Sequence, residues 1–494
     1  MPTLSRFFFA YFLFSLPLVA EPWTDPAPPK AATLTEQAAP APQAFDRLTF
    51  HQAPKPLNKA AVTSEWARFL GPNHDATSPE THLLHDWPKE GLAPVWEVKK
   101  GDCYTSPAIV GDHLVLFHAL DKKETIECLH PETGQRYWSY EYPMEYRDRY
   151  GFANGPRGSP VIAEDRVITL GVTSVLTCLE LKTGRLIWQR DLKAEFGVEQ
   201  DFFGHGSTPL VMDGKVIVNV GGKSSQLCVG AFDLQTGGLL WGVKDEWTAS
   251  YASPIPATLQ GQQVVLVFAG GESNPATGGL LCINPKDGTV HDRFPWRADD
   301  YISVNAMSPV VIAEKNRVFV STSYPKGRPL GGVMIEFDEK LKAKEVWSSK
   351  KLAVHWMNPL YKDGYLYAID GETERIARLV CVSADTGVEQ WRKDLSWEDT
   401  ELSPGKAASM SVQRASLLMV DGRCLCLGEL GSLLWLDLSP EDCKIEAHTQ
   451  LFYAPHTWCL PAVRKGLLYV MQNYEEQVRG KTGQRMLCFD LRAP

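Results

Sequence analysis

Short apolar runs separated by polar turn residues dominate the chain from about residue 94 onward. Residues 161–162, 166–170 and 175–179 are typical, because each is rich in β-branched or aliphatic residues and is bounded by turn-forming residues. Runs of this length and composition predict β-strands joined by tight turns. The pattern therefore predicts an all-β protein built from many short strands.

These strands belong to a repeated unit. Each unit opens with a small residue and proline, continues through three strands, and ends in a turn whose glycine lies four residues before a tryptophan. The opening positions recur every 45 to 55 residues and are Pro107, Pro160, Pro209, Pro254, Pro309, Pro359, Met410 and Pro461. The tryptophans are Trp96, Trp138, Trp188, Trp241, Trp347 and Trp391. Exposing a large indole side chain to solvent in nearly every unit is unfavourable. We therefore expect each tryptophan to pack between neighbouring units.

Eight such units predict an eight-bladed β-propeller with four strands in each blade. The fourth unit has His291 where tryptophan is expected, and the seventh has lost both glycine and tryptophan. The last unit ends after its third strand, whereas a spare tryptophan strand, residues 94–98, precedes the first unit. We therefore expect this N-terminal strand to complete the last blade and close the ring.

The first 62 residues lack the repeat. Arg6 precedes an apolar run from Phe7 to Ala20 that is shorter than the roughly 20 residues of a membrane span, which predicts a signal peptide at residues 1–20. An uncleaved N-terminal membrane anchor is the alternative. Residues 21–62 are rich in proline and alanine without apolar periodicity, which predicts a disordered linker. The propeller then occupies residues 63–494.

The net charge of −9 and the absence of a dense Lys/Arg block exclude nucleic acid as a partner, because phosphate contacts need clustered cations. The sequence also contains no metalloprotease, serine-hydrolase, Cys-x-x-Cys or EF-hand motif, so we predict neither a metal site nor a catalytic residue.

The tryptophan repeat resembles the PQQ-type propeller repeat. In addition, the segment from Trp66 to Asn73, followed by Trp87-Pro88 and Val95-Trp96, is similar to exported bacterial PQQ-binding-like β-propeller repeat proteins. The same repeat occurs in quinoprotein alcohol dehydrogenases and in the outer-membrane assembly propeller BamB. The resemblance implies the fold, but it implies no single activity because one fold hosts many functions.

Two groups stand out among the eleven cysteines. Equivalent positions of the repeat hold Cys128, Cys178, Cys282, Cys381 and Cys488, which lie too far apart in a ring to pair and are expected to act as small core residues. Cys103 and Cys459 precede the anchors of the first and last units, which are neighbours in a closed ring. A disulfide between them is a hypothesis that would lock the ring.

The long connections from each tryptophan strand to the next anchor are the chemically richest segments, and in propellers of this type they gather around one mouth of the central channel. Aromatic faces with Arg, His and Asn between them suit a planar ligand, a sugar or a peptide. His205 and Arg157 are the strongest candidates because glycines flank both. The predicted ligand-binding residues are Arg157, His205, Tyr251, Asn305, His355, Trp356, His456 and Trp458. Channel-plugging or packing roles are the alternative for each of them.

Two functions fit this sequence. The first is an exported, monomeric, non-catalytic scaffold, periplasmic or extracellular, that needs no cofactor and binds a protein or glycan of the cell envelope at its mouth. The second is a PQQ-dependent quinoprotein dehydrogenase that oxidises an alcohol or sugar, which would need calcium beside the quinone and an aspartate base. The sequence lacks the adjacent cysteine pair of quinoprotein alcohol dehydrogenases, although Asp201, Asp299 and Asp300 could supply carboxylates.

Overall fold

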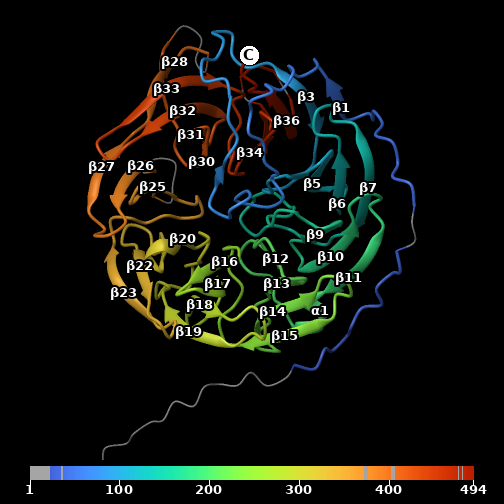
Figure 1. Ribbon diagram of the computed structural model, residues 1–494, viewed down its shortest axis with the longest axis vertical. Coiled ribbons are helices and arrows are strands. Elements are labelled where there is room, and N and C mark those ends of the chain that lie inside the picture. Colours follow the sequence, from blue (N-terminus) through green and yellow to red (C-terminus); the bar gives the residue numbers. More distant parts are fainter. Residues whose placement is uncertain (1–22, 35–36, 372–376, 402–405, 477, 481) are drawn as a thin grey trace, which may run out of the picture.

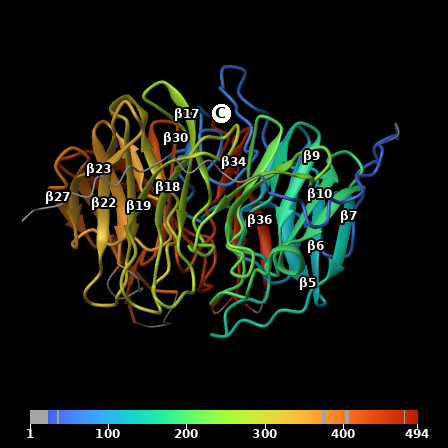
Figure 2. The ribbon, with the colours of Figure 1, turned by 90° about the horizontal axis from the view of Figure 1, so that it is seen from below.

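Each repeat folds into an antiparallel sheet, and eight such sheets stand around a common axis in the computed structural model (Figures 1 and 2). The structure describes residues 23–34, 37–371, 377–401, 406–476, 478–480 and 482–494. The predicted signal peptide, residues 1–20, lies outside the described residues. In each blade the first strand lies nearest the axis and the tryptophan strand lies toward the outer edge of the ring, so the prediction of an eight-bladed, all-β propeller is confirmed.

Blades 1 to 4 follow one another along the chain. Blade 1 contains β4 (Ala108–Val110), β5 (His113–Leu120), β6 (Lys123–Leu129) and β7 (Arg136–Pro143). Blade 2 contains β8 (Val161–Ala163), β9 (Arg166–Leu170), β10 (Val175–Glu180) and β11 (Leu186–Asp191), after which comes the short helix α1 (Leu192–Phe196). Blade 3 contains β12 (Leu210–Met212), β13 (Lys215–Asn219), β14 (Leu227–Asp233) and β15 (Leu239–Lys244). Blade 4 contains β16 (Ile255–Leu259), β17 (Gln262–Ala269), β18 (Gly279–Ile283) and β19 (Val290–Pro295).

Blades 5 to 8 complete the ring, and the last two receive strands from the N-terminal segment. Blade 5 contains β20 (Val310–Ile312), the 3₁₀ turn η1 (Ala313–Lys315), β21 (Arg317–Thr322), β22 (Gly331–Phe337) and β23 (Ala343–Ser349). Blade 6 contains β24 (Leu360–Lys362), β25 (Tyr365–Asp370), β26 (Arg378–Ser383) and β27 (Glu389–Lys393), followed by a separate hairpin of β28 (Ser396–Asp399) and β29 (Ala408–Ser411). Blade 7 contains β2 (Thr77–Ser78), β30 (Ala415–Val420), β31 (Arg423–Gly428), β32 (Ser432–Leu438) and β33 (Cys443–Gln450). Blade 8 contains β34 (Ala462–Arg464), β35 (Leu467–Gln472), β36 (Arg485–Asp490), β3 (Pro94–Lys99) and β1 (Leu48–Phe50).

The spare N-terminal tryptophan strand lies in the last blade. β3 pairs antiparallel with β36, with Trp96 opposite Cys488. The same register places Trp138 opposite Cys128, and a β-bulge follows that pair. Cysteine also lies opposite Trp188 and Trp391, whereas Ala231 lies opposite Trp241 and Met334 lies opposite Trp347.

The indole of each motif tryptophan does bridge two blades. Trp96 donates its Nε1–H to the carbonyl of Pro131 at 2.8 Å, and Trp138 donates to Leu181 at 2.8 Å. The other pairs are Trp188 with Leu234, Trp241 with Pro285, Trp347 with Ala384 and Trp391 with Ser439. Each acceptor lies in the turn before the tryptophan strand of the following blade, so a buried donor is satisfied while the ring packs between two sheets.

Blade 4 corrects one assignment made from the sequence. The residue in register with the motif tryptophans is Asp292, which lies opposite Cys282, and not His291. Asp292 accepts the backbone N–H of Ala343 in blade 5 at 2.6 Å. A carboxylate therefore makes the contact to the next blade that an indole makes elsewhere.

Blade 7 corrects a second assignment. Met410, read as the opening of the seventh unit, belongs to β29 and pairs with Trp397 in the extra hairpin. The innermost strand of this blade's own meander is β30, which turns at Asp421 and Gly422, so Leu417 takes the opening position. The hairpin is inserted between blades 6 and 7, so the true seventh anchor lies later in the chain than the regular repeat length predicts. Spacing alone therefore misplaced the anchor.

The segment predicted to be a disordered linker lies against the ring in its described part. In Figure 1 it follows the outer edge of the ring as a dark blue trace. Asp25 accepts hydrogen bonds from the buried Arg190 at 2.6 and 2.9 Å, and Trp23 packs against Gly242. Further along, the Arg47 guanidinium bonds the buried carboxylate of Glu127 at 2.6 Å. We call the described residues between 23 and 50 the strap. A few widely spaced anchors hold it, and such anchors produce no periodic signal in the sequence.

A second N-terminal segment, residues 64–84, crosses the middle of the ring (Figure 1). Its backbone pairs with the innermost strands of blades 1 and 2, through Trp66 with Ile109 and through Ala67 with Ile162. At its other end, Glu80 accepts the backbone N–H groups of Lys465 and Gly466 in blade 8 at 2.7 and 2.9 Å. We call this segment the plug because it lies across the ends of the innermost strands where they turn outward.

Candidate functional site

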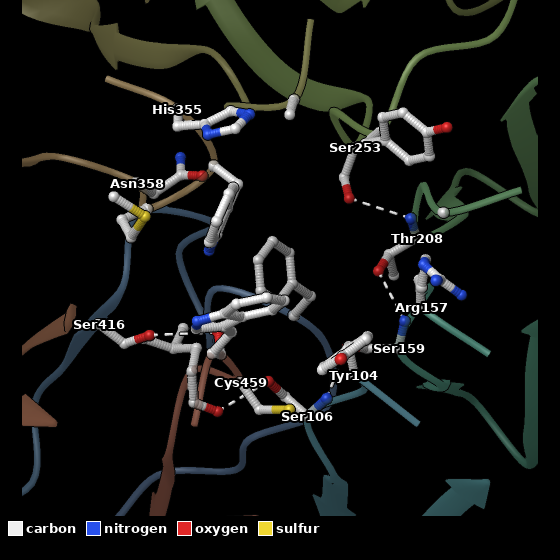
Figure 3. A pocket seen from close by; sticks show the side chains of 18 of the residues that line it. Tyr104, Ser106, Arg157, Ser159, Thr208, Ser253, His355, Asn358, Ser416 and Cys459 are labelled. Carbon is white, nitrogen blue, oxygen red and sulfur yellow. Dashed lines mark hydrogen bonds between the residues drawn. The ribbon is translucent and has the colours of Figure 1, made fainter. Parts of the chain in front are cut away.

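A cavity of about 320 Å³ occupies the centre of the ring. Its walls come from the loops that lead into the innermost strands, and Phe69 and Leu70 of the plug line it as well. Figure 3 shows the lining side chains gathered around this space from several blades. Because the plug contributes Phe69 and Leu70 at the ends of the inner strands, we describe the cavity as a cup.

A belt of small polar side chains surrounds the cup. Each belt residue immediately precedes the opening proline of its unit, and the belt side chains of blades 2 to 6 each accept a backbone N–H from the preceding blade. The bonds run from Ser106 N to Ser159 Oγ (2.9 Å), from Ser159 N to Thr208 Oγ1 (2.9 Å), from Thr208 N to Ser253 Oγ (3.0 Å), from Ser253 N to Ser308 Oγ (3.0 Å) and from Ser308 N to Asn358 Oδ1 (3.2 Å). Ser106 Oγ in turn donates to the carbonyl of Leu460 in blade 8 at 2.7 Å. The small residue before each proline therefore ties neighbouring blades together at the wall of the channel (Figure 3).

Aromatic side chains form a continuous arc over part of the cup. Trp458 stacks on Tyr104 with ring centroids 5.1 Å apart, and Trp356 lies 5.0 Å from Trp458. Phe152 connects Trp458 to Phe203, at 5.7 and 5.8 Å. These contacts hold the rings in place, so the arc is a preformed wall rather than a set of independent side chains.

Two arginines line the cup, and each is paired with a carboxylate behind it. Arg157 donates to Asp148 at 2.8 Å and lies 5.5 Å from the Tyr104 ring centroid. Arg414 donates through Nε to Glu429 at 2.7 Å and lies 4.7 Å from the Trp458 centroid. The side chains of Asp148 and Glu429 are 0% and 4% exposed, so the guanidinium groups face the cup and the carboxylates do not.

The structure brings most of the predicted ligand-binding residues together. Five of them line the cup: Arg157, Tyr251, His355, Trp356 and Trp458. His456 stacks on Trp458 at 4.2 Å and lies within hydrogen-bond distance of the Tyr104 hydroxyl, with Nδ1 and oxygen 3.4 Å apart. It therefore supports the wall from outside the lining.

His205 and Asn305 do not line the cup. His205 is buried beside Ser174, 3.1 Å from Nδ1 to Oγ, and burial lowers the pKa of its imidazole to about 4. Asn305 donates to the carbonyls of Ala269 and Trp296 at 2.8 and 3.1 Å, which fixes a connection in blade 4. The glycines beside His205 allow close backbone packing and do not give a ligand access to it: a β-carbon on Gly204 would lie 2.5 Å from Val172.

Sequence reasoning missed three parts of the site. Arg414 precedes the true seventh innermost strand and was hidden by the inserted hairpin. The belt left a visible signal, namely the Ser, Thr or Asn before each proline, which we interpreted only as a small residue. Phe69 and Leu70 lie far from the repeat in sequence and carry no signal for their place in the cup.

The carboxylates that the sequence offered for a catalytic role lie outside the cup. Asp201 accepts the backbone N–H groups of Phe202 and Glu272, both at 2.7 Å, and burial raises its pKa to about 6. Neither Asp201 nor Asp299 nor Asp300 lines the cup. In the described part of the chain, no group of three or more His, Cys, Asp or Glu side chains is placed to hold a metal ion.

All eleven cysteines are buried and are free thiols in this structure. Cys459 lines the cup, and its sulfur accepts a hydrogen bond from Asn473 at 3.3 Å. The hypothetical Cys103–Cys459 disulfide is therefore not formed here.

The fold and site together define an eight-bladed propeller with a central cup. The chain belongs to the family of the outer membrane protein assembly factor BamB, whose model matches residues 122–393, more than half of the sequence. A search of curated proteins finds no match. No helix within the described ranges is long and apolar enough to cross a membrane.

Solved structures share the fold at low sequence identity. BamB from Moraxella catarrhalis has 12% identity and a TM-score of 0.52, with 82% of this chain and 98% of that chain covered. A europium-containing methanol dehydrogenase has 12% identity and a TM-score of 0.56, covering 86% and 98%. The quinohemoprotein alcohol dehydrogenase from Comamonas testosteroni has 13% identity and a TM-score of 0.58, covering 87% and 81%. These neighbours include an assembly factor and redox enzymes, so they establish the fold alone.

Proposed function

We propose that this protein is an exported, non-catalytic scaffold that holds a protein or glycan of the cell envelope in its cup. The observation that carries the proposal is the chemistry of the lining. Aromatic walls, hydroxyl groups and two arginines converge on one small space, and no carboxylate is among its described lining residues. Such a lining can bind and orient a ligand, but it supplies no carboxylate for the aspartate base that a quinone-dependent alcohol oxidation would need.

The family name supports a partner in the cell envelope, because assembly factors act on other proteins there. The apolar run at residues 7–20 supports export. The mapped belt and plug support a rigid scaffold, since the walls of the cup are tied from blade to blade and to the N-terminal segment.

The alternative, a PQQ-dependent dehydrogenase, is weakened by the same lining. The aromatic arc and arginines would suit a planar anionic quinone, but calcium beside it would need carboxylate or carbonyl oxygens. Asp148 and Glu429, the carboxylates behind the cup, are paired with Arg157 and Arg414. The residues present therefore do not fit a calcium–quinone pair.

The test compares capture of envelope components by the wild-type protein and by a variant with a filled cup. Ala306 lines the cup, so Ala306→Phe should occupy it. Val346→Phe on the exposed outer strand β23 is the matched control. Capture that Ala306→Phe abolishes and Val346→Phe retains supports the proposal. Equal capture by both variants, or dye-linked alcohol oxidation after titration with PQQ and calcium, would overturn it.

A further inference from the structure

The cup contains hydrogen-bond donors that have no acceptor among the described residues. The hydroxyl oxygens of Ser159, Thr208 and Ser253 each accept one backbone N–H, which fixes their positions, and no hydrogen bond of these hydroxyls as donors occurs in the described chain. The indole Nε1–H of Trp356 is buried and likewise has no acceptor among the described residues. A buried donor without an acceptor is unfavourable, so these groups favour a ligand that brings acceptor atoms.

The charge of the lining points the same way. The described lining residues include no Asp or Glu, and the arginines Arg157 and Arg414 have their carboxylate partners behind them. A carboxylate entering the cup would therefore meet guanidinium groups and hydroxyl donors, with no exposed acid among the described lining residues to repel it. Hydrogen bonds to an ionised acceptor are about twice as strong as those between neutral groups.

The remaining surface of the cup is apolar and the space is small. Phe69, Leu70 and the aromatic arc supply most of the wall, and 320 Å³ lies near the lower limit of about 300 Å³ for ligand pockets. A helix or a folded loop would not enter this space. A single large apolar side chain attached to an acceptor group would fit within it.

An apolar path leads out of the cup over its rim. Tyr150 is 56% exposed and lies 5.3 Å from Phe203, which lines the cup. Tyr301 and Ile302, from the connection between blades 4 and 5, are also half exposed, and Phe202 joins Tyr301 to this group at 5.5 Å. A ligand that ends in the cup could therefore continue as a chain across these exposed side chains.

We infer that the cup receives the C-terminal residue of a partner polypeptide. The α-carboxylate meets the hydroxyls of Ser159, Thr208 and Ser253, together with the Trp356 indole and the arginines. The apolar side chain lies between the arc and the plug, and the preceding residues lie on Tyr150, Tyr301 and Ile302. This inference rests on the proposed binding function and specifies which part of the partner is bound. Capture of a terminal carboxylate by fixed donors is an established mode of peptide recognition.

The test uses fluorescence anisotropy with two hexapeptides labelled at the N-terminus and ending in phenylalanine, one a free acid and one a C-terminal amide. The free acid should bind at least about ten-fold more tightly, as expected for a hydrogen bond to a charged group. Equal binding of acid and amide would overturn carboxylate recognition. N-acetylphenylalanine separates a polypeptide from a free small acid: competition as strong as that of the unlabelled peptide would overturn the polypeptide assignment.

Two serine variants each remove one interblade hydrogen bond of the same kind, but only one of the two serines lines the cup. Ser253→Ala and Ser308→Ala each delete a serine oxygen that accepts a backbone N–H at 3.0 Å, but only Ser253 lines the cup. Ser253→Ala should weaken the free-acid peptide by about ten-fold and leave the amide unchanged, whereas Ser308→Ala should change neither. Equal effects of the two variants would contradict the donor role.

The two proposals can fail separately. If neither peptide binds while Ala306→Phe still abolishes capture of the envelope partner, the C-terminal inference is wrong and the cup remains the binding site. If Ala306→Phe captures partners as the wild type does, the proposed function is wrong as well.

Discussion

The indole ring of Trp138 in blade 1 lies against Gly184 in blade 2 so closely that a β-carbon on Gly184 would sit 2.5 Å from the ring. Gly184 also has a φ of +72°, which L-residues with side chains rarely adopt. The same contact joins Trp96 to Gly134, where the β-carbon would lie 2.9 Å from the ring. The glycine and tryptophan of the repeat are thus two halves of one contact between adjacent blades.

We predict that Gly184→Ala lowers the free energy of unfolding by about 2–4 kcal/mol, because it adds backbone strain and overpacks the indole. Urea unfolding at equilibrium measures the change. Gly214→Ala is the control: Gly214 has a φ of +70° but an added β-carbon would meet nothing within 4 Å, so only the strain of about 1 kcal/mol remains. Equal losses in the two variants would contradict the role of the indole contact.

Asp25 should hold the first part of the strap on the ring. Burial raises its pKa, but the hydrogen bonds and charge of Arg190 outweigh this and keep the pKa of Asp25 below its ordinary value. The pairing is therefore present at neutral pH and is lost as the pH falls through that lowered pKa. Asp25→Asn leaves the fully buried Arg190 with Glu195 as its remaining carboxylate partner in the described chain.

We expect trypsin to cleave after Lys30 about ten-fold faster in Asp25→Asn, because local opening of the strap exposes this bond at a loss of about 1.4 kcal/mol. Glu199→Gln, which removes an exposed pair with Lys223, should leave the rate unchanged. Unchanged cleavage in Asp25→Asn would show that the strap is held without this ion pair.

Glu124 makes the stability of the blade 1–blade 2 contact depend on pH. Its carboxyl is buried and accepts the backbone N–H of Val172 at 2.7 Å, and burial raises its pKa to about 7. Because the folded-state pKa lies above the unfolded value of 4.5, the stabilising contribution is complete below about pH 4.5 and is lost as the pH rises to about 7.

Between pH 5 and pH 8, the wild type should lose about 2.5 kcal/mol more stability than Glu124→Gln, as measured by urea unfolding at each pH. The exposed Glu141, which pairs with Lys123, provides the control, and Glu141→Gln should keep the wild-type pH dependence. A Glu124→Gln profile parallel to the wild type would contradict the raised pKa.

The cysteines should be unreactive in the native protein. Burial raises the pKa of Cys459 to about 12, and the neighbouring thiol of Cys103 adds to the effect. We expect no thiol to react with a water-soluble disulfide reagent at pH 8 before unfolding and all eleven to react afterwards. Protein purified from the cell envelope that yields nine thiols after unfolding would instead indicate that Cys103 and Cys459 are joined.

The sequence by itself determined the eight units, the tryptophan contacts between blades and the spare strand that joins the last blade. These features are local and periodic. A glycine at a fixed distance from a tryptophan indicates which turn each unit forms and which contact it makes with the next unit. The sequence also allowed Arg157, Trp356 and Trp458 to be predicted as site residues, because they lie in the connections that a propeller gathers at one mouth.

Only the tertiary structure decided which residues line the cup. His205 and Arg157 occupy similar glycine-flanked segments, yet one side chain is buried beside Ser174 and the other faces the cavity. That direction depends on the local backbone path, which residue type and spacing do not specify. The strap and plug depend on contacts between residues hundreds of positions apart, such as Glu80 with Gly466. A sequence pattern records which residues recur along the chain, whereas packing in three dimensions decides which of them surround the same space.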